Sequence, residues 1–129
     1  MNYSITHDLE DQIIAVLMEG EMELGGFTRM LDEVGVKILQ TQCYDLLVDV
    51  TQLKVKLSFL ELTALPGIMH ITLRKHQIEA SALRGAVVLP RSRNVREMYQ
   101  VFAQHIGGSL KNFPNKETAK RWLKEAKNI

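Results

Sequence analysis

Apolar and polar residues alternate with a period of two near the N-terminus, and this pattern predicts a β-hairpin. Residues 3–7 alternate around the small polar residues Ser4 and Thr6, as in a strand with one buried face. Residues 12–18, QIIAVLM, predict a second strand. The polar turn at residues 8–11 is short, so the two strands should pair antiparallel.

The pattern then changes to a helical period over residues 26–42, where apolar and charged positions fall on opposite faces. The next segment, YDLLVDV at residues 44–50, is almost continuously apolar. Such a run is typical of a central strand that is covered on both faces. Residues 51–57 alternate only weakly, so they are interpreted as either a loop or a short extended segment.

Helical patterns return between residues 58 and 79. Ser58 is followed three positions later by Glu61, the spacing of a capping box, so a helix should begin at Ser58. Pro66 and Gly67 should break or kink this helix, because proline lacks the amide N–H and its ring clashes with the preceding turn. A second helical stretch is expected from Ile68 to about Glu79.

Strand and helix alternate in the rest of the chain. LRGAVVL at residues 83–89 predicts a buried strand that Pro90 ends, and Asn94 is expected to cap an amphipathic helix that closes at Gly107 and Gly108. Residues 110–113 are a short strand candidate, and a final helix should follow a cap at Asn115. Four apolar positions form the expected inner face of that helix: Ala119, Trp122, Leu123 and Ala126.

This order of elements predicts one α/β domain over residues 1–129. The alternation after the opening hairpin favours a mixed, mostly parallel sheet of about five strands with an antiparallel N-terminal edge hairpin. About four to five helices should pack against the sheet. The length is ordinary for one domain with its own core, and no linker, repeat or low-complexity segment divides the chain.

In their order and spacing, these elements resemble the SpoIIAA-like branch of the STAS superfamily, including its STAS/SEC14-like bacterial proteins of largely undefined role. The segments LLVDV at 46–50 and LRGAVVL at 83–89 carry the resemblance, together with the ending that combines Phe113, Ala119, Trp122 and Leu123. The resemblance implies a SpoIIAA-like fold and a bacterial module that binds a protein partner.

The resemblance also raises a phosphorylation hypothesis for Ser58. In the anti-sigma-factor antagonists of this superfamily, a strand ending in Asp leads to a D-S-S-G-type loop whose first serine is phosphorylated. If Asp49 is that Asp, Ser58 lies where the acceptor serine would be. However, Leu57 replaces the acidic neighbour, and Phe59 and Leu60 replace the small Ser-Gly pair. Ser58 is therefore interpreted first as a capping serine.

Charge and hydropathy narrow the classes of partner. Sixteen Lys and Arg against fifteen Asp and Glu give a net charge of +1, which provides no global attraction for nucleic acid. No segment approaches the roughly 18 apolar residues of a membrane span, and the first ten residues lack the apolar core of a signal peptide. A cytoplasmic location is expected. Cys43, the single cysteine, is interpreted as a partly buried small hydrophobe.

Sequence signatures of catalysis and metal binding are absent. His70 and His76 lie about 600° apart around a helix, so they cannot bind one metal ion together. The paired glycines match neither phosphate-loop pattern, and there is no G-x-S-x-G elbow. We expect no enzymatic activity, no metal and no cofactor.

The sharpest candidate site is PRSRNVR at residues 90–96, between a buried strand and a helix. Ligands usually bind at this carboxyl edge of open α/β sheets. Arg91, Arg93 and Arg96, beside the free amides expected at Asn94, have the chemistry to bind a phosphate, a carboxylate or an acidic protein surface. The alternative interpretation is three solvated surface arginines. Ser58 is the other candidate at this edge.

Met69 suggests a different kind of site. It follows Pro66 and Gly67, so it is a candidate for the lining of a mobile apolar groove. Two functions therefore remain open. The first is a non-enzymatic, regulatory protein-interaction module that uses the carboxyl edge of the sheet. The alternative is a carrier of a small apolar or anionic, lipid-like ligand in a SEC14-like groove. A homodimer is compatible with both.

Overall fold

The sheet contains five strands in the order β1-β2-β3-β4-β5 in the computed structural model, which describes residues 1–106 and 108–127. β1 (Asn2–Asp8) and β2 (Ile13–Glu21) form the antiparallel edge hairpin. β3 (Asp45–Lys54), β4 (Arg84–Val88) and β5 (Ser109–Phe113) continue the sheet parallel to β2. The predicted fold class, a mixed and mostly parallel sheet with an N-terminal hairpin, is confirmed.

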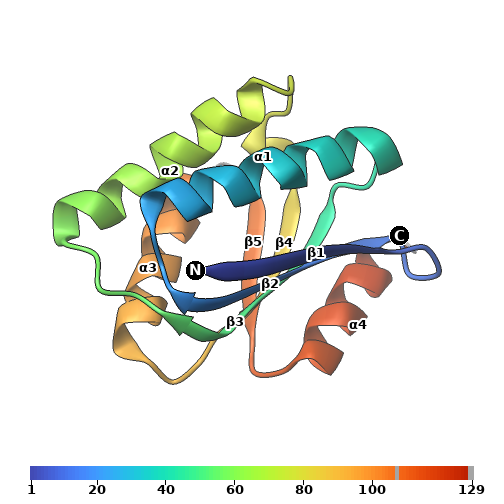
Figure 1. Cartoon of the computed structure of the whole chain (residues 1–129). Coiled ribbons are helices and arrows are strands. Elements are labelled where there is room, and N and C mark those ends of the chain that lie inside the picture. The colour runs from blue at the N-terminus through green and yellow to red at the C-terminus, as the bar shows by residue number, and fades with distance from the viewer. Residues whose placement is uncertain (107, 128–129) are drawn as a thin grey trace.

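Helices cover both faces of this sheet, but unequally. α1 (Leu24–Thr41), α2 (Phe59–Arg74) and α3 (Arg93–His105) pack on one face, and α4 (Lys116–Lys127) packs on the other (Figure 1). A short 3-10 turn, Ala80–Ala82, precedes β4. The four helices agree with the predicted number. Gly107, part of the expected helix closure, and the side chain of Ala126 lie outside the described residues.

The central position of β3 in the sheet explains why its sequence is almost continuously apolar. Successive side chains of a strand point to opposite faces of the sheet. Leu46 and Val50 therefore lie in the core beneath α1, α2 and α3, whereas Leu47 packs with Ala119 and Leu123 of α4. The strand is covered on both sides, as predicted. It also extends to Lys54, so the first part of the uncertain segment at residues 51–57 is strand.

α2 departs from the prediction. It is one continuous helix from Phe59 to Arg74, so of the predicted break or kink at Pro66 the break is wrong, and so is the separate second helix ending near Glu79. Proline removes one helical hydrogen bond, but packing of an apolar face supplies most helical stability in a protein. Pro66 is itself buried on this face beside Leu65, which is fully buried.

α3 begins earlier than predicted. Its first residue is Arg93, and Ser92 occupies the N-cap position without a side-chain capping bond. Asn94 is therefore inside the helix, and the predicted cap at Asn94 is wrong. Its side chain instead donates to the backbone oxygen of Val55, 3.1 Å away. The predicted cap at Asn115 is present, because its Oδ1 accepts from the Thr118 amide at 2.9 Å.

Candidate binding surface and internal cavity

The segments that precede α2 and α3 meet at the carboxyl edge of the sheet. β3 leads into Ser58 and β4 leads into Arg91, and parallel strands end at the same edge. The hydrogen bond from Asn94 to Val55 joins the two segments directly. The structure therefore places Ser58, Arg91 and Asn94 on one edge, while Met69 lies farther along α2.

The Ser58 side chain is engaged in a complete capping box. Its Oγ accepts from the Glu61 amide at 3.2 Å, and the Ser58 amide donates to Glu61 Oε1 at 2.9 Å. These bonds to Ser58 lower the pKa of the Glu61 carboxyl. Each bond satisfies an amide that the first turn of a helix leaves without a helical partner. The hydroxyl of Ser58 therefore has a structural role, because it caps the N-terminus of α2.

The three arginines do not converge on one point. Arg93 Nε donates to Glu97 Oε1 at 3.0 Å, and an Arg96 guanidinium nitrogen donates to the Pro90 carbonyl at 3.3 Å. Arg91 is exposed, and no acidic group of the described residues pairs with it. Of these three arginines, only Arg91 presents a guanidinium group that is not already engaged by another described residue.

One aromatic and one aliphatic side chain, Phe59 and Leu60, lie exposed next to Ser58, and the sequence reasoning did not include them among the candidate site residues. Phe59 is 75% exposed and Leu60 is 78% exposed. The helical period contained a signal for Leu60 alone, which falls opposite the buried Leu62 and Leu65. Phe59 lies three residues before Leu62 and so shares its face, which is why the period did not predict its exposure. Large apolar side chains that lie together in solvent often mark an interaction surface.

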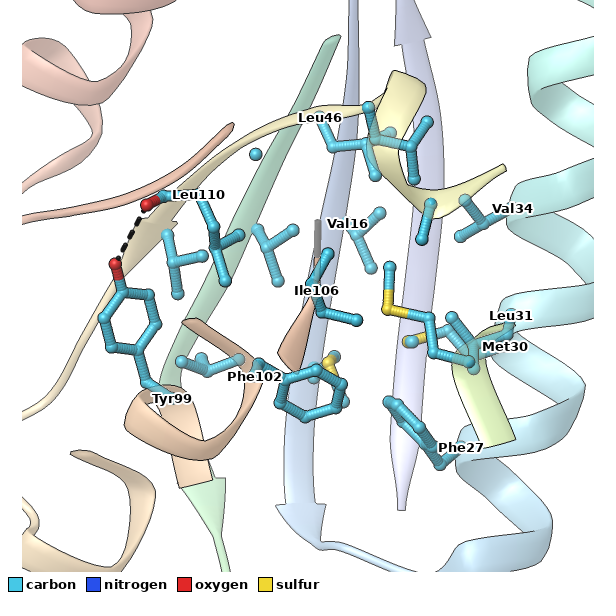
Figure 2. A pocket seen from close by; sticks show the side chains of 18 of the residues that line it. Val16, Phe27, Met30, Leu31, Val34, Leu46, Tyr99, Phe102, Ile106 and Leu110 are labelled. Carbon is cyan, nitrogen blue, oxygen red and sulfur yellow. Dashed lines mark hydrogen bonds between the residues drawn. The ribbon is translucent and has the colours of Figure 1, made fainter. Parts of the chain in front are cut away.

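An apolar cavity of about 120 Å³ lies between the sheet and α1, α2 and α3 (Figure 2). Side chains from β2–β5 and from these three helices line it, including those of Phe27, Met30, Met69, Phe102 and Ile106. Met69, expected to line an apolar groove, lies in this wall. No charged residue belongs to the lining.

Tyr99 supplies one of the few polar groups near the cavity. Its hydroxyl donates to the Leu110 backbone oxygen at 3.3 Å, and burial raises the pKa of the phenol despite an opposing contribution from Asn112. Leu110 packs closely against Gly85 in this wall, where an added Cβ would lie 2.7 Å from Leu110 Cδ1. Because its lining is apolar and holds no charged residue, the cavity suits an apolar, uncharged ligand.

Asp49 lies on the opposite face of the sheet and is bound within the fold. Its Oδ1 accepts from the amide and hydroxyl of Thr51 at 2.9 and 2.7 Å, and Lys116 Nζ lies 3.3 Å from Oδ2. Burial alone would raise the pKa of Asp49, but the Thr51 and Lys116 interactions outweigh it and lower the pKa. This carboxylate fixes the start of α4 to β3.

Cys43, His70 and His76 each contact a different part of the fold. Cys43 is buried, and its thiol donates to the Gln12 carbonyl at 3.1 Å. His76 contacts Asp32, whereas His70 contacts the His105 carbonyl, so the two histidines are separate. Within residues 1–106 and 108–127, no group of three or more His, Cys, Asp or Glu could hold a metal ion. No helix in the same ranges is long and apolar enough to cross a membrane.

The fold defines the class, α/β domains with the SpoIIAA-like fold, in which a five-stranded mixed sheet carries helices on both faces. Along the whole chain, the unphosphorylated form of the anti-sigma factor antagonist SpoIIAA superposes with a TM-score of 0.63 and 15% identity, covering 99% of this chain and 98% of that one. The phosphorylated form of the Bacillus cell fate determinant SpoIIAA gives a TM-score of 0.58 at 15% identity, covering 94% and 99%.

A third similar structure is an uncharacterised protein of the DUF3478 family from Shewanella loihica, with a SpoIIAA-like fold. It has a TM-score of 0.62 and 18% identity, and the match covers 95% of this chain and 92% of that one. No family model matches the sequence. No curated protein matches it either. At these identities the similarity establishes the fold, and the SpoIIAA-like fold predicted from the sequence is confirmed.

Proposed function

We propose that this protein is a non-enzymatic binding module that recognises a protein partner at the carboxyl edge of its sheet. The observation that carries the proposal is the exposure of Phe59 and Leu60 directly after the Ser58 cap. Arg91 lies on the same edge and adds a free cation. An apolar centre with a cationic border is a common composition of protein-binding surfaces. The similarity in fold to an anti-sigma factor antagonist supports the same class of function.

Affinity capture from a bacterial lysate, read by mass spectrometry, tests this proposal. The variants are Phe59→Ser with Leu60→Ser, and Arg91→Ser with Arg93→Ser. The control is Leu9→Ser, which removes an equally exposed leucine (76%) from the hairpin turn. Proteins that the wild type and the control enrich should be lost with the first variant and reduced with the second. Identical protein sets for all four baits would overturn the proposal.

A second function is supported by the cavity. An unfilled apolar cavity destabilises a protein by about 24 cal/mol per Å³, so about 120 Å³ corresponds to about 3 kcal/mol. Cavities of similar size bind small apolar molecules. We therefore propose, as the alternative, that the protein carries a small uncharged apolar ligand. An anionic ligand is not supported there, because the lining holds no cation.

Native mass spectrometry of the freshly purified protein, followed by solvent extraction, tests the carrier function. A bound molecule should appear as added mass and be recovered in the organic phase. Benzene added to extracted protein should raise the melting temperature, because a ligand that binds only the folded state stabilises it. Protein without added mass that also gives no benzene response would overturn this alternative.

A further inference from the structure

The exposed apolar surface does not stop at the carboxyl edge but continues along the outer side of α2. Leu60 and Ile71 are 78% and 64% exposed, and Ala64 and Gly67 are exposed between them. The spacing of four, three and four residues places all of them on one line along the helix. We call Leu60, Ala64, Gly67 and Ile71 the α2 ridge.

The shape of the α2 ridge suits a second helix. Its two large side chains stand about 16 Å apart along the axis, at a rise of 1.5 Å per residue. The centre is low, because Ala64 is small and a Cβ at Gly67 would meet no atom within 4 Å. Small residues at the point of contact allow two helices to approach closely.

The charges at the ends of the ridge indicate the chemistry of the occupant. Lys54 and Lys56 precede α2 and Lys75 follows it, and within the described part of the chain no acidic group pairs with them. Arg74 is already neutralised by Glu79 at 3.3 Å, and the Glu61 carboxylate is bound to the Ser58 amide. Free positive charge therefore stands at both ends of an uncharged line.

We propose that the α2 ridge binds an amphipathic helix of a partner protein that carries acidic residues at both ends of its apolar face. This inference rests on the proposed protein-binding function and names its partner chemistry. A second copy of this chain fits less well, because an antiparallel pair of α2 helices would bring Lys56 of one copy towards Lys75 of the other. Opposite charges at the rim give a complex its register and selectivity.

Two fluorescent synthetic helices provide the probe. They share one leucine stripe and differ only in their ends, which carry Glu in one peptide and Lys in the other. Fluorescence anisotropy should show the Glu-ended peptide binding the wild type at least tenfold more tightly than the Lys-ended peptide. Lys56→Glu with Lys75→Glu should reverse this preference, whereas Ile71→Ser should weaken the binding of both peptides at least tenfold.

Gly67→Leu separates close helix packing from general apolar attraction. The position is open, so the variant should melt no lower than the wild type, yet the added side chain should weaken the Glu-ended peptide by blocking close approach. Leu9→Ser, in the hairpin turn, should bind like the wild type. Equal binding of the two peptides, or binding of neither, would overturn the inference.

Two further measurements test the other possible occupants of the α2 ridge, a second copy of the chain and a membrane surface. Light scattering that shows a dimer, dissociated by Ile71→Ser, would replace the partner helix with a second copy. Sedimentation with vesicles of phosphatidylcholine and phosphatidylserine, lost on Ile71→Ser, would identify a membrane surface instead and overturn the inference. If Phe59→Ser with Leu60→Ser abolishes partner capture while Ile71→Ser does not, this inference fails and the proposed function stands.

Discussion

Single residues at the start of α2 show how a site residue can be explained by local chemistry alone. Ser58 and Glu61 satisfy each other's backbone amides, and the helix dipole favours the negative charge of Glu61 in the first turn. The phosphorylation hypothesis remains untested at this position. An acidic group at Ser58 would also suit the cap, so a charge change there need not disturb the fold.

Ser58→Ala should lower the free energy of unfolding by about 1 kcal/mol, because it leaves the Glu61 amide without its partner. Ser58→Asp should keep nearly wild-type stability, since Asp also caps a helix. Urea unfolding at neutral pH measures both changes. Ser92→Ala is the matched control, because Ser92 occupies the N-cap of α3 without a side-chain capping bond. Equal losses for the two alanine variants would show that the Ser58 bonds contribute nothing.

Asp49 should make stability depend on acid pH. Its pKa is lower in the folded protein than its ordinary value. The ionised form therefore stabilises the fold above the unfolded-state pKa of about 4, and this contribution disappears as pH falls through the folded-state pKa. Asp49→Asn should cost about 2 kcal/mol at pH 7 and progressively less on acidification.

Urea unfolding between about pH 7 and pH 2 measures this effect across the range in which carboxylates titrate. Lys116→Met should reproduce part of the Asp49→Asn profile, because Lys116 is the cation beside that carboxylate. Arg121→Met, on an exposed position of the same helix, should leave the profile unchanged. A constant difference between Asp49→Asn and the wild type at every pH would contradict the assignment.

At the scale of elements, the contact between α1 and the end of α2 depends on one glycine. The His76 ring packs against Gly35 so closely that a Cβ there would lie 2.6 Å from the ring, and the ring also contacts Asp32 at 3.2 Å. Gly67 of α2 is the opposite case, because its missing side chain faces open space. The two helical glycines therefore predict opposite effects of the same substitution.

Gly67→Ala should raise the free energy of unfolding by about 0.5–1 kcal/mol, since alanine favours a helix more than glycine does. Gly35→Ala should lower it despite the same gain in propensity, because the imidazole must move from its place against α1. Thermal and urea unfolding of the two variants side by side measure the difference in sign. Stabilisation by both substitutions would show that the His76 ring is free to leave.

At the scale of the whole molecule, the two faces of the sheet are packed differently. α4 closes a compact core of Ile13, Leu47 and Leu123, whereas the three-helix side encloses the apolar cavity. No single element creates this cavity, because residues of four strands and three helices line it together. The carrier function therefore depends on how the helices sit over the sheet.

Val16→Ile should distinguish a real cavity from a filled core. Val16 is buried and lines the cavity, so the extra methylene can enter empty space and add up to about 0.8 kcal/mol of stability. In a close-packed core the same change costs about 1–3 kcal/mol. Urea unfolding gives the sign, and the benzene-induced rise in melting temperature should shrink. A destabilised variant with an undiminished benzene response would contradict the cavity.

Several features of the fold could be predicted from the sequence because local interactions determine them. The period-two hairpin, the doubly covered strand around Leu47 and the caps at Ser58 and Asn115 all appear in the structure. Alternation of strand and helix was enough to predict a mostly parallel sheet, since short right-handed connections leave few alternatives.

Tertiary structure decided the features that depend on contacts between distant segments. Pro66 lies within one continuous helix because the buried face of α2 packs against the core. Asn94 does not cap α3 as expected; its side chain donates a hydrogen bond to the Val55 carbonyl, 39 residues away. The cavity around Met69 and the exposed α2 ridge are likewise results of packing. Periodicity shows which residues share a face, but only the assembled layers determine whether that face is covered, left open or held apart around empty space.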